Sequence, residues 1–162
     1  RAVQYWLTAV AHRDSSTDPV GHAFGVIEND SGAIVNTAGF YPIVDGLDND
    51  GYGIADYVFN STVPGSIVDE RYRSHLGDFL KWRETGVAPN NGLISASTYS
   101  LTQQQYEAVM RFMEQWGVRS DYTKSRMCGT FVQGMIRAAG YSPPTGDVAP
   151  SDLYDYFRTD GR

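Results

Sequence analysis

The stretch SRMCGTFVQGMIRAAGY, residues Ser125–Tyr141, contains the only cysteine of the chain, Cys128. The apolar residues that follow it recur at the spacing of one helix face: Phe131, Val132, Met135, Ile136 and Ala139. A helix is therefore predicted from about Cys128 to Gly140, because glycine favours a helix end. The cysteine falls in the first turn of this helix, on the side of its buried face.

A lone cysteine in this position has two interpretations. In the first, Cys128 is a core residue, since free cysteines are among the most buried residue types. In the second it is a nucleophile, because the N–H groups and the dipole of a helix N-terminus favour the thiolate over the thiol. Gly129 follows directly and allows another backbone to approach the sulfur closely. The polar residues before the cysteine, SDYTKSRM, are expected to leave one side of the sulfur open.

A cysteine nucleophile needs a base, and the chain has three histidines. His22 lies in GHAFGVIEND, a predicted strand, and a rigid strand suits a base that must stay in line with the sulfur. The alternative is a half-exposed strand histidine without a catalytic role. His12 is the rival, because pairing of the first two predicted strands brings it close to His22. His75 has the weakest case, since its segment is ambiguous between helix and strand.

Composition and charge exclude several classes of protein. With 162 residues, 41% hydrophobic and 20% charged, the chain is predicted to form a single globular domain, residues 1–162. The net charge is −6, and lysine and arginine form no stripe, which argues against a nucleic-acid partner. No apolar run is long enough to span a membrane, and the first residues lack a signal-peptide pattern. One cysteine excludes an intramolecular disulfide and a multi-cysteine zinc site, and neither a cofactor nor a metal is expected.

The first third of the chain is predicted to be β-structure. Strand formers dominate three stretches: AVQYWLTAVAH (2–12), VGHAFGVIEND (20–30) and AIVNTAGFYP (33–42). The turn formers NDSG between the last two indicate a hairpin. The acidic stretch VDGLDNDGYGIADY (44–57) is predicted to be a loop. It does not fit an EF-hand, because a register with Gly51 at the sixth position puts Gly46 and Tyr57 at positions that need oxygen ligands.

The remaining segments give clearer helices and one clear strand. A helix is predicted over Gln103–Trp116, with a capping box from Thr102 and Gln105 and a glycine after its end. ISASTYSL (94–101) is a predicted strand, whereas GSIVDERYRSHLGDFLKW (65–82) stays ambiguous. Ser151 is predicted to cap a short final helix.

Four pieces of the chain, in their order and spacing, resemble the circularly permuted branch of the NlpC-like papain-fold cysteine hydrolases. They are GHAFGVIENDSGAIVNTAGFYP (21–42), PGSIVDE (64–70), YSLTQQQYEAVMRFME (99–114) and MCGTFVQGMIRAAG (127–140). The resemblance implies an α+β, papain-like fold in which the cysteine helix packs on a small antiparallel sheet. Carried over by position, it implies Cys128 as the nucleophile and His22 as the general base. Members often have asparagine before the cysteine, where this chain has Met127.

Papain-like sites usually have a third polar residue that orients the imidazole, and in this family it tends to come from the strand after the histidine strand. The candidates are Asn36 and Thr37. Strand alternation allows only one of them to share the face of His22, and a register slip of one residue exchanges them. We choose Asn36, because its amide oxygen can accept a hydrogen bond from the imidazole. Asp14, in the connection after the first strand, is an alternative.

The resemblance implies hydrolysis of amide or peptide bonds, first of all in peptidoglycan, by a cell-wall amidase or endopeptidase of the antibacterial effector or toxin type. A helix N-terminal N–H, such as that of Cys128, would stabilise the oxyanion. The implied partners are peptidoglycan or a peptide substrate and a cognate immunity protein. The protein would be secreted or delivered to the periplasm of a target cell. The alternatives are a lipid acyltransferase, thioesterase or deamidase on the same scaffold, a non-catalytic binding module, and an immunity-type or structural protein.

Overall fold

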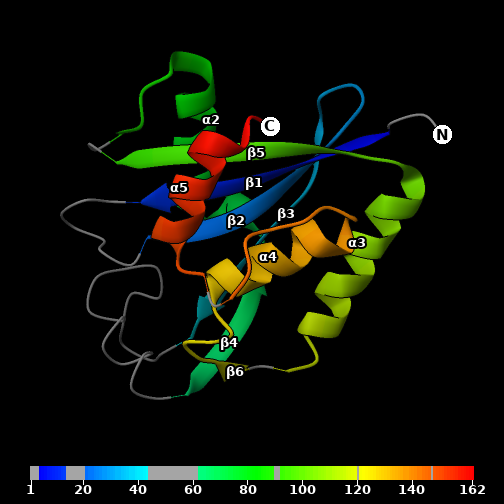
Figure 1. The fold of residues 1–162 in the computed structure, drawn as a ribbon, viewed down its shortest axis with the longest axis vertical. Coiled ribbons are helices and arrows are strands. Elements are labelled where there is room, and N and C mark those ends of the chain that lie inside the picture. The colour runs from blue at the N-terminus through cyan, green and yellow to red at the C-terminus, as the bar shows by residue number, and fades with distance from the viewer. Residues whose placement is uncertain (1–3, 14–20, 44–61, 90–91, 120, 147) are drawn as a thin grey trace.

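The structure, a computed structural model, describes residues 4–13, 21–43, 62–89, 92–119, 121–146 and 148–162. Within these ranges, six strands form an antiparallel sheet in the order β5-β1-β2-β3-β4-β6 (Figure 1). Their bounds are β1 (Tyr5–Arg13), β2 (His22–Asn29), β3 (Ile34–Pro42), β4 (Val63–Val68), β5 (Leu93–Leu101) and β6 (Asp121–Tyr122). The described chain is therefore an α+β protein with an antiparallel sheet, as the sequence predicts.

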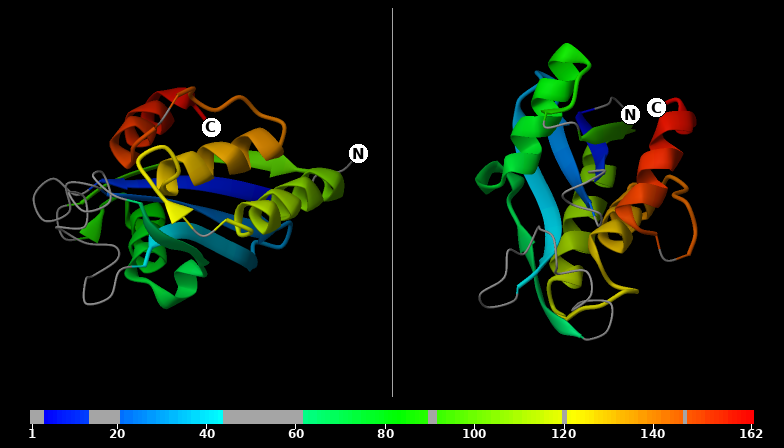
Figure 2. Two further views of the ribbon diagram at one scale, coloured as in Figure 1. Left: turned by 90° about the horizontal axis from the view of Figure 1, so that it is seen from below. Right: turned by 90° about the vertical axis from the view of Figure 1, so that its left-hand side faces the viewer.

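Helices cover both faces of the sheet. They are the short 3₁₀ helix η1 (Glu70–Tyr72) and the α-helices α2 (Ser74–Thr85), α3 (Gln103–Trp116), α4 (Cys128–Ala138) and α5 (Pro150–Asp160). In Figure 2, α4 and α5 lie over one face and α2 lies against the other. The cysteine helix α4 packs mainly on β2 and β3, and α5 packs on β1 and β5. No helix in the described ranges is both long and apolar enough to cross a membrane.

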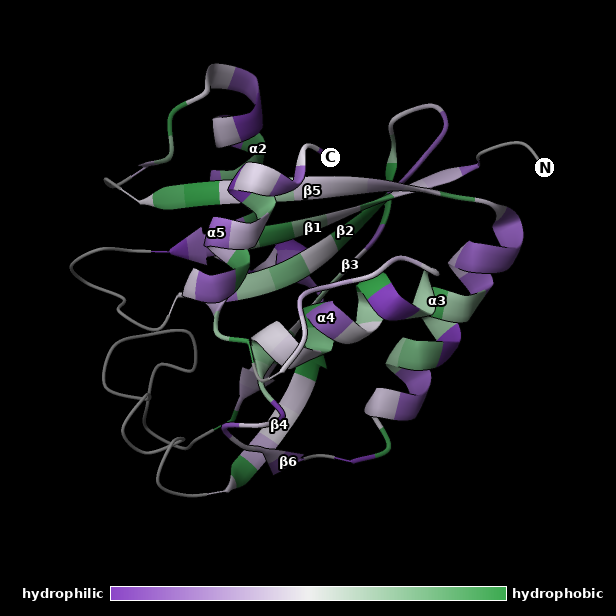
Figure 3. Ribbon diagram, in the orientation of Figure 1, coloured by the Kyte–Doolittle hydropathy of each residue, from purple (hydrophilic) through white to green (hydrophobic). Residues whose placement is uncertain are grey.

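Alternation along β2 divides the core between the two helical layers. Ala23 and Ile27 belong to the cluster that includes α4, whereas Phe24 and Val26 belong to the cluster that includes α2. Hydrophobic residues run along β1 and β2 between these layers, and the surface turns of the helices carry hydrophilic residues (Figure 3). A one-residue shift of β2 would exchange the two sets, so the packing on both faces fixes the register.

The predicted hairpin is confirmed. Asn29 ends β2, and its side-chain oxygen accepts hydrogen bonds from the N–H groups of Ser31 and Ala33. Gly32 has a φ of 87°, in the left-handed region that glycine adopts without steric cost. The turn therefore closes through local chemistry that the sequence contains.

The two helices predicted most clearly are also confirmed. α3 has the bounds expected, and Thr102 accepts a hydrogen bond from the N–H of Gln105 while the Gln105 side chain accepts one from the N–H of Thr102. α4 begins at Cys128, and all five residues of its predicted apolar face are buried.

The final helix differs from its prediction. It begins at Pro150 after Ala149, so Ser151 lies inside the helix and does not cap it. Proline fits the first helical position because it has no N–H to leave unsatisfied. Asp152 accepts a hydrogen bond from the N–H of Ala149 and closes the helix start instead. The ambiguous segment 65–82 resolves into the end of β4, then η1 and most of α2. The predicted acidic loop 44–57 lies outside the described residues.

Candidate active site around β2

Cys128 is the first residue of α4, and its exposed fraction is 2%. Burial raises the pKa of the thiol from its ordinary value of 9.0 to about 11, against hydrogen bonds from the Ala23 N–H, the Tyr122 phenol and the Gly129 N–H that act to lower it. At neutral pH the sulfur therefore carries its proton in this state. The expectation that the helix N-terminus alone yields a thiolate is wrong here, because desolvation outweighs the local donors.

Tyr122, on β6, contacts Cys128 in two ways. The N–H of Cys128 donates to the phenol oxygen at 3.2 Å, and the phenol also acts to lower the pKa of the thiol. Burial raises the pKa of Tyr122 well above 10.0, so the phenol remains a donor at neutral pH. The sulfur and the first N–H of the helix thus share one polar neighbour.

The contact with Ala23 fixes the sulfur relative to the sheet. Backbone N–H groups of a strand point sideways in the plane of the sheet, and not toward its faces. A sulfur that accepts a hydrogen bond from the Ala23 N–H therefore reaches the backbone of β2, beside the residue that follows His22. The sulfur of the predicted nucleophile therefore lies beside the backbone of the residue that follows the predicted base, His22.

The His22 side chain, however, points the other way. His22 is the first residue of β2 and shares a face with Phe24, opposite to Ala23. Its ring lies 4.2 Å from that of Tyr41 and 4.5 Å from that of His75, between ring centroids. Among the described residues no hydrogen bond joins the His22 ring to the sulfur of Cys128, so the predicted direct Cys–His contact is not formed in this structure.

The His22 ring is held by a buried glutamate. Nε2 of His22 lies 2.8 Å from Oε2 of Glu70, whose side chain is fully buried. The other carboxylate oxygen accepts a hydrogen bond from the Tyr41 phenol at 2.7 Å, and the same phenol lies 2.9 Å from Nδ1 of His75. Four side chains from β2, β3, η1 and α2 thus form one network, which we call the His22–Glu70 network: His22, Tyr41, Glu70 and His75.

Burial sets the protonation of this network. It lowers the pKa of His22 to about 3 and that of His75 to about 2, with neighbouring positive charges acting in the same direction. Burial also raises the pKa of Glu70 to about 7, although the His75 charge and the Tyr41 hydrogen bond act to lower it. Both rings are therefore uncharged at neutral pH, as a general base must be before it takes up a proton.

His12, the rival base, is the cross-strand partner of His22, so the expected approach of the two residues is confirmed. Its ring packs edge-on against His75, with the centroids 5.5 Å apart. His75, the residue with the weakest case from sequence, is buried and joins the network through the Tyr41 phenol.

The choice of Asn36 as the orienting residue is wrong. Asn36 pairs with Ile27, on the face of α4, and its amide donates to the sulfur of Met110 at 3.4 Å. Thr37 is on the face of His22, but it hydrogen-bonds to the Asp69–Glu70 segment and not to the ring. Glu70 orients His22 instead. Asp14 lies outside the described residues.

Thr37 positions Glu70 through two hydrogen bonds. Its hydroxyl accepts from the N–H of Glu70 at 2.8 Å and donates to a carboxylate oxygen of Asp69 at 2.6 Å. We expect Thr37→Val to lower the free energy of unfolding by about 1–3 kcal/mol, because the isosteric side chain leaves the buried N–H of Glu70 without its acceptor. Thr37→Ser keeps the oxygen and is expected to lose less. Urea denaturation measures both, and equal stability of the two variants would contradict the role of the hydroxyl.

Sequence reasoning missed Glu70, Tyr41 and Tyr122. Glu70 lies in the VDE piece of the resemblance, and Tyr41 in its FYP piece, but neither piece by itself indicates a contact with His22. Glu70 is 48 residues from His22, and its approach depends on Gly39. A Cβ at Gly39 would overlap the Glu70 carboxylate and lie 2.7 Å from Nε2 of His22.

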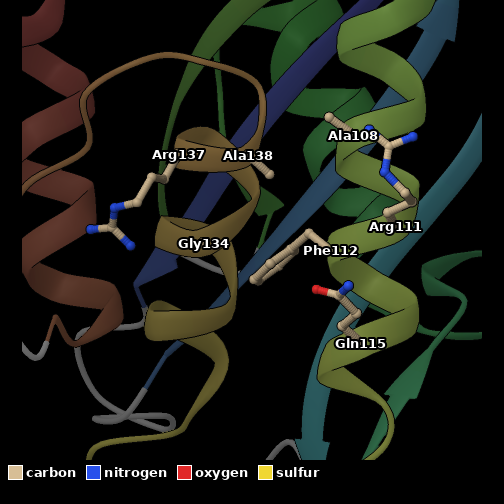
Figure 4. A pocket seen from close by; sticks show the side chains of 7 residues that line it. All are labelled: Ala108, Arg111, Phe112, Gln115, Gly134, Arg137 and Ala138. Atoms are coloured by element: carbon tan, nitrogen blue, oxygen red, sulfur yellow. The ribbon is translucent and has the colours of Figure 1, made fainter.

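Two clefts lie where α3 meets α4, away from this site. Figure 4 shows one of them, in which Phe112 reaches from α3 toward Gly134 of α4. A Cβ on Gly134 would overlap the Phe112 ring, so the glycine permits this close helix contact. Neither cleft is lined by Cys128, His22 or Glu70.

No protein-family model, curated protein or solved structure matches this chain. The case for a function therefore depends on the side chains described above and on the resemblance in the sequence.

Proposed function

We propose that the protein is a cysteine hydrolase of the papain-like, NlpC-like type that cleaves amide or peptide bonds. Cys128 is the nucleophile, His22 the general base, and Glu70 the residue that orients the imidazole. The observation that carries the proposal is the polar surrounding of the sulfur at a helix start, with donors from Ala23, Gly129 and Tyr122.

The reaction divides into acylation and hydrolysis. The Cys128 thiol transfers its proton to the His22 imidazole, and the sulfur attacks the carbonyl carbon of the substrate. The tetrahedral intermediate collapses to a thioester as the imidazolium gives the proton to the leaving amine. His22 then takes a proton from water, which attacks the thioester and releases the carboxylic acid, and the thiol regains its proton.

Tyr122 and the N–H of Cys128 are suited to stabilise the oxyanion. They lie 3.2 Å apart beside the sulfur, and the phenol keeps its proton at neutral pH. A substrate carbonyl that enters between them would accept from both donors and would replace their contact with each other.

The reactive arrangement requires the His22 ring to reach the sulfur. Catalytic hydrogen bonds in ligand-free enzymes are often long or poorly aligned and form only when the substrate binds. His22 is the first residue of β2, and its neighbour Ala23 already contacts the sulfur through its N–H. Because the Cβ of His22 points to the α2 face, rotation of the side chain alone does not bring the ring to the sulfur, and the mechanism needs the backbone at the first residue of β2 to turn as well.

Peptidoglycan is the substrate class that we propose, with secretion or delivery to the periplasm of a target cell and a cognate immunity protein as a partner. These three proposals depend on the family resemblance and on no contact in the fold. A lipid acyl group or a protein glutamine side chain would meet the same nucleophile and is the alternative substrate.

One observation favours a second candidate, a non-catalytic binding module. Cys128 is buried and its thiol pKa is raised, as expected of a structural cysteine. In that case the side chains around β2 serve only to stabilise the sheet.

Digestion of purified peptidoglycan separates the two candidates. We expect wild-type protein to release fragments that mass spectrometry identifies, and Cys128→Ala and His22→Ala to release them at least about 10³-fold more slowly. Circular dichroism of the variants controls for folding. If Cys128→Ala cuts as fast as wild type, the nucleophile is wrong. If wild type releases no product from peptidoglycan or from acyl and glutamine substrates, the proposed hydrolase is contradicted and the non-catalytic binding module is favoured.

A further inference from the structure

We propose that His22, Glu70 and His75 form a binding site for a divalent transition-metal ion of the zinc class. One ligand atom from each of the three buried residues lies within 4.8 Å of the other two. Two imidazole nitrogens and a carboxylate oxygen are a donor set that zinc and iron(II) accept in proteins, with further coordination positions left open.

The spacing of the donor atoms fits one small ion. Zinc–ligand bonds of about 2.0–2.1 Å at tetrahedral angles place two ligand atoms about 3.4 Å apart. Nε2 of His22 lies 2.8 Å from Oε2 of Glu70, and Nδ1 of His75 lies 3.8 Å from Oε1 of Glu70. All three ligand atoms lie within 4.8 Å of one another, so modest side-chain movements bring them to coordination distance, with the ion in place of the proton between His22 and Glu70.

The surroundings of the three residues support the same conclusion. Gly39 leaves the space in which the carboxylate and the His22 ring meet, since a Cβ there would overlap Glu70. The Tyr41 phenol donates to the carboxylate, and Thr37 accepts from the N–H of Glu70. Outer contacts of this kind orient the ligands in known metal sites and tune their affinity.

The site has a consequence that rests on the proposed function. A metal bound to Nε2 would hold the His22 ring on the α2 side of the sheet, whereas acylation needs it at the sulfur of Cys128. Zinc is therefore expected to inhibit the hydrolase by sequestering its base.

Metal binding is measured without reference to activity. We expect the purified protein to bind one Co²⁺, seen as visible absorption bands, and one Zn²⁺ in competition with a chromophoric chelator. His75→Ala and Glu70→Gln are expected to weaken binding by about 100-fold or more, because each removes one ligand. His12→Ala and Cys128→Ala are the controls. The first removes an imidazole that packs beside His75 and the second removes the thiol, and neither group is one of the three proposed ligands, so both variants should bind the metal as wild type does.

The outcomes separate this inference from the proposed function. The site is overturned if folded wild type binds neither ion, or if Glu70→Gln binds as tightly as wild type. Loss of binding in Cys128→Ala also overturns it, because the ion would then sit on the sulfur. Tight binding that leaves peptidoglycan cleavage unchanged confirms the site and contradicts the sequestration of His22. Tight binding to a protein without hydrolase activity keeps the site and removes the proposed function.

Discussion

Iodoacetamide is expected to alkylate Cys128 in the folded protein at least about 100-fold more slowly at pH 7.5 than in the unfolded chain. The reason is ionisation: only the thiolate reacts, and a rise of the thiol pKa from 9.0 to about 11 lowers the thiolate fraction by two orders of magnitude. Burial of the sulfur adds to this protection. Since the chain has a single cysteine, intact-mass spectrometry measures the rate without ambiguity.

The same shift makes the folding stability depend on pH. The folded pKa lies above the unfolded one, so the contribution of Cys128 to stability is fully present below pH 9 and is lost as the pH rises through 11. Wild type should therefore lose about 2–3 kcal/mol relative to Cys128→Ala between these values. Alkylation that is fast at neutral pH, with an apparent pKa below 9.0, would contradict the buried thiol.

Slow alkylation of the resting protein is compatible with both candidate functions. An enzyme of the proposed type would form its reactive thiolate only when a bound substrate brings His22 to the sulfur. Alkylation therefore tests the geometry of the resting site, whereas the peptidoglycan digest tests the chemistry.

Gly129→Ala is expected to lower the free energy of unfolding by about 2 kcal/mol, although alanine is the better helix former. A Cβ at Gly129 would overlap the backbone carbonyl of Val148, which packs against the first turn of α4. Backbone cannot move aside as the end of a flexible side chain can, so either the helix start or the segment at Val148 must shift. Because Cys128 precedes this glycine, the variant should also disturb the sulfur site.

Gly77→Ala is the matched control for this substitution. Gly77 is an exposed residue of α2, and a Cβ there meets no atom within 4 Å among the described residues. The same chemical change should raise stability by about 0.5–1 kcal/mol, through helix propensity alone. Urea denaturation of the two variants gives effects of opposite sign. If Gly129→Ala is also stabilised, the carbonyl of Val148 does not pack against the helix start.

Local patterns in the sequence were enough to predict much of the fold. The capping box of Thr102 and Gln105 and the apolar face of α4 involve residues three or four positions apart, so a helix expresses them directly. The hairpin at Asn29 likewise closes through neighbouring residues. These contacts need no knowledge of the rest of the chain.

The orienting residue of His22 was not predictable in this way. The register of β2 and β3 shifts between Ile27 and Glu28, and this irregularity decides that Asn36 faces Met110 of α3 whereas Thr37 faces Asp69 and Glu70 on the other side of the sheet. Glu70 then reaches His22 from 48 residues away, through the space that Gly39 leaves. A strand register and a long-range approach both depend on packing that the sequence does not display.

The sequence by itself determined that a cysteine begins an amphipathic helix and that a histidine lies within a β-strand. Those features follow from periodicity and capping, which act over a few residues. Only the tertiary structure decided that the sulfur is buried beside Ala23 and that the His22 ring points to Glu70 on the opposite face. Side-chain direction and desolvation arise where distant segments meet, and they set the protonation on which any chemistry of Cys128 depends.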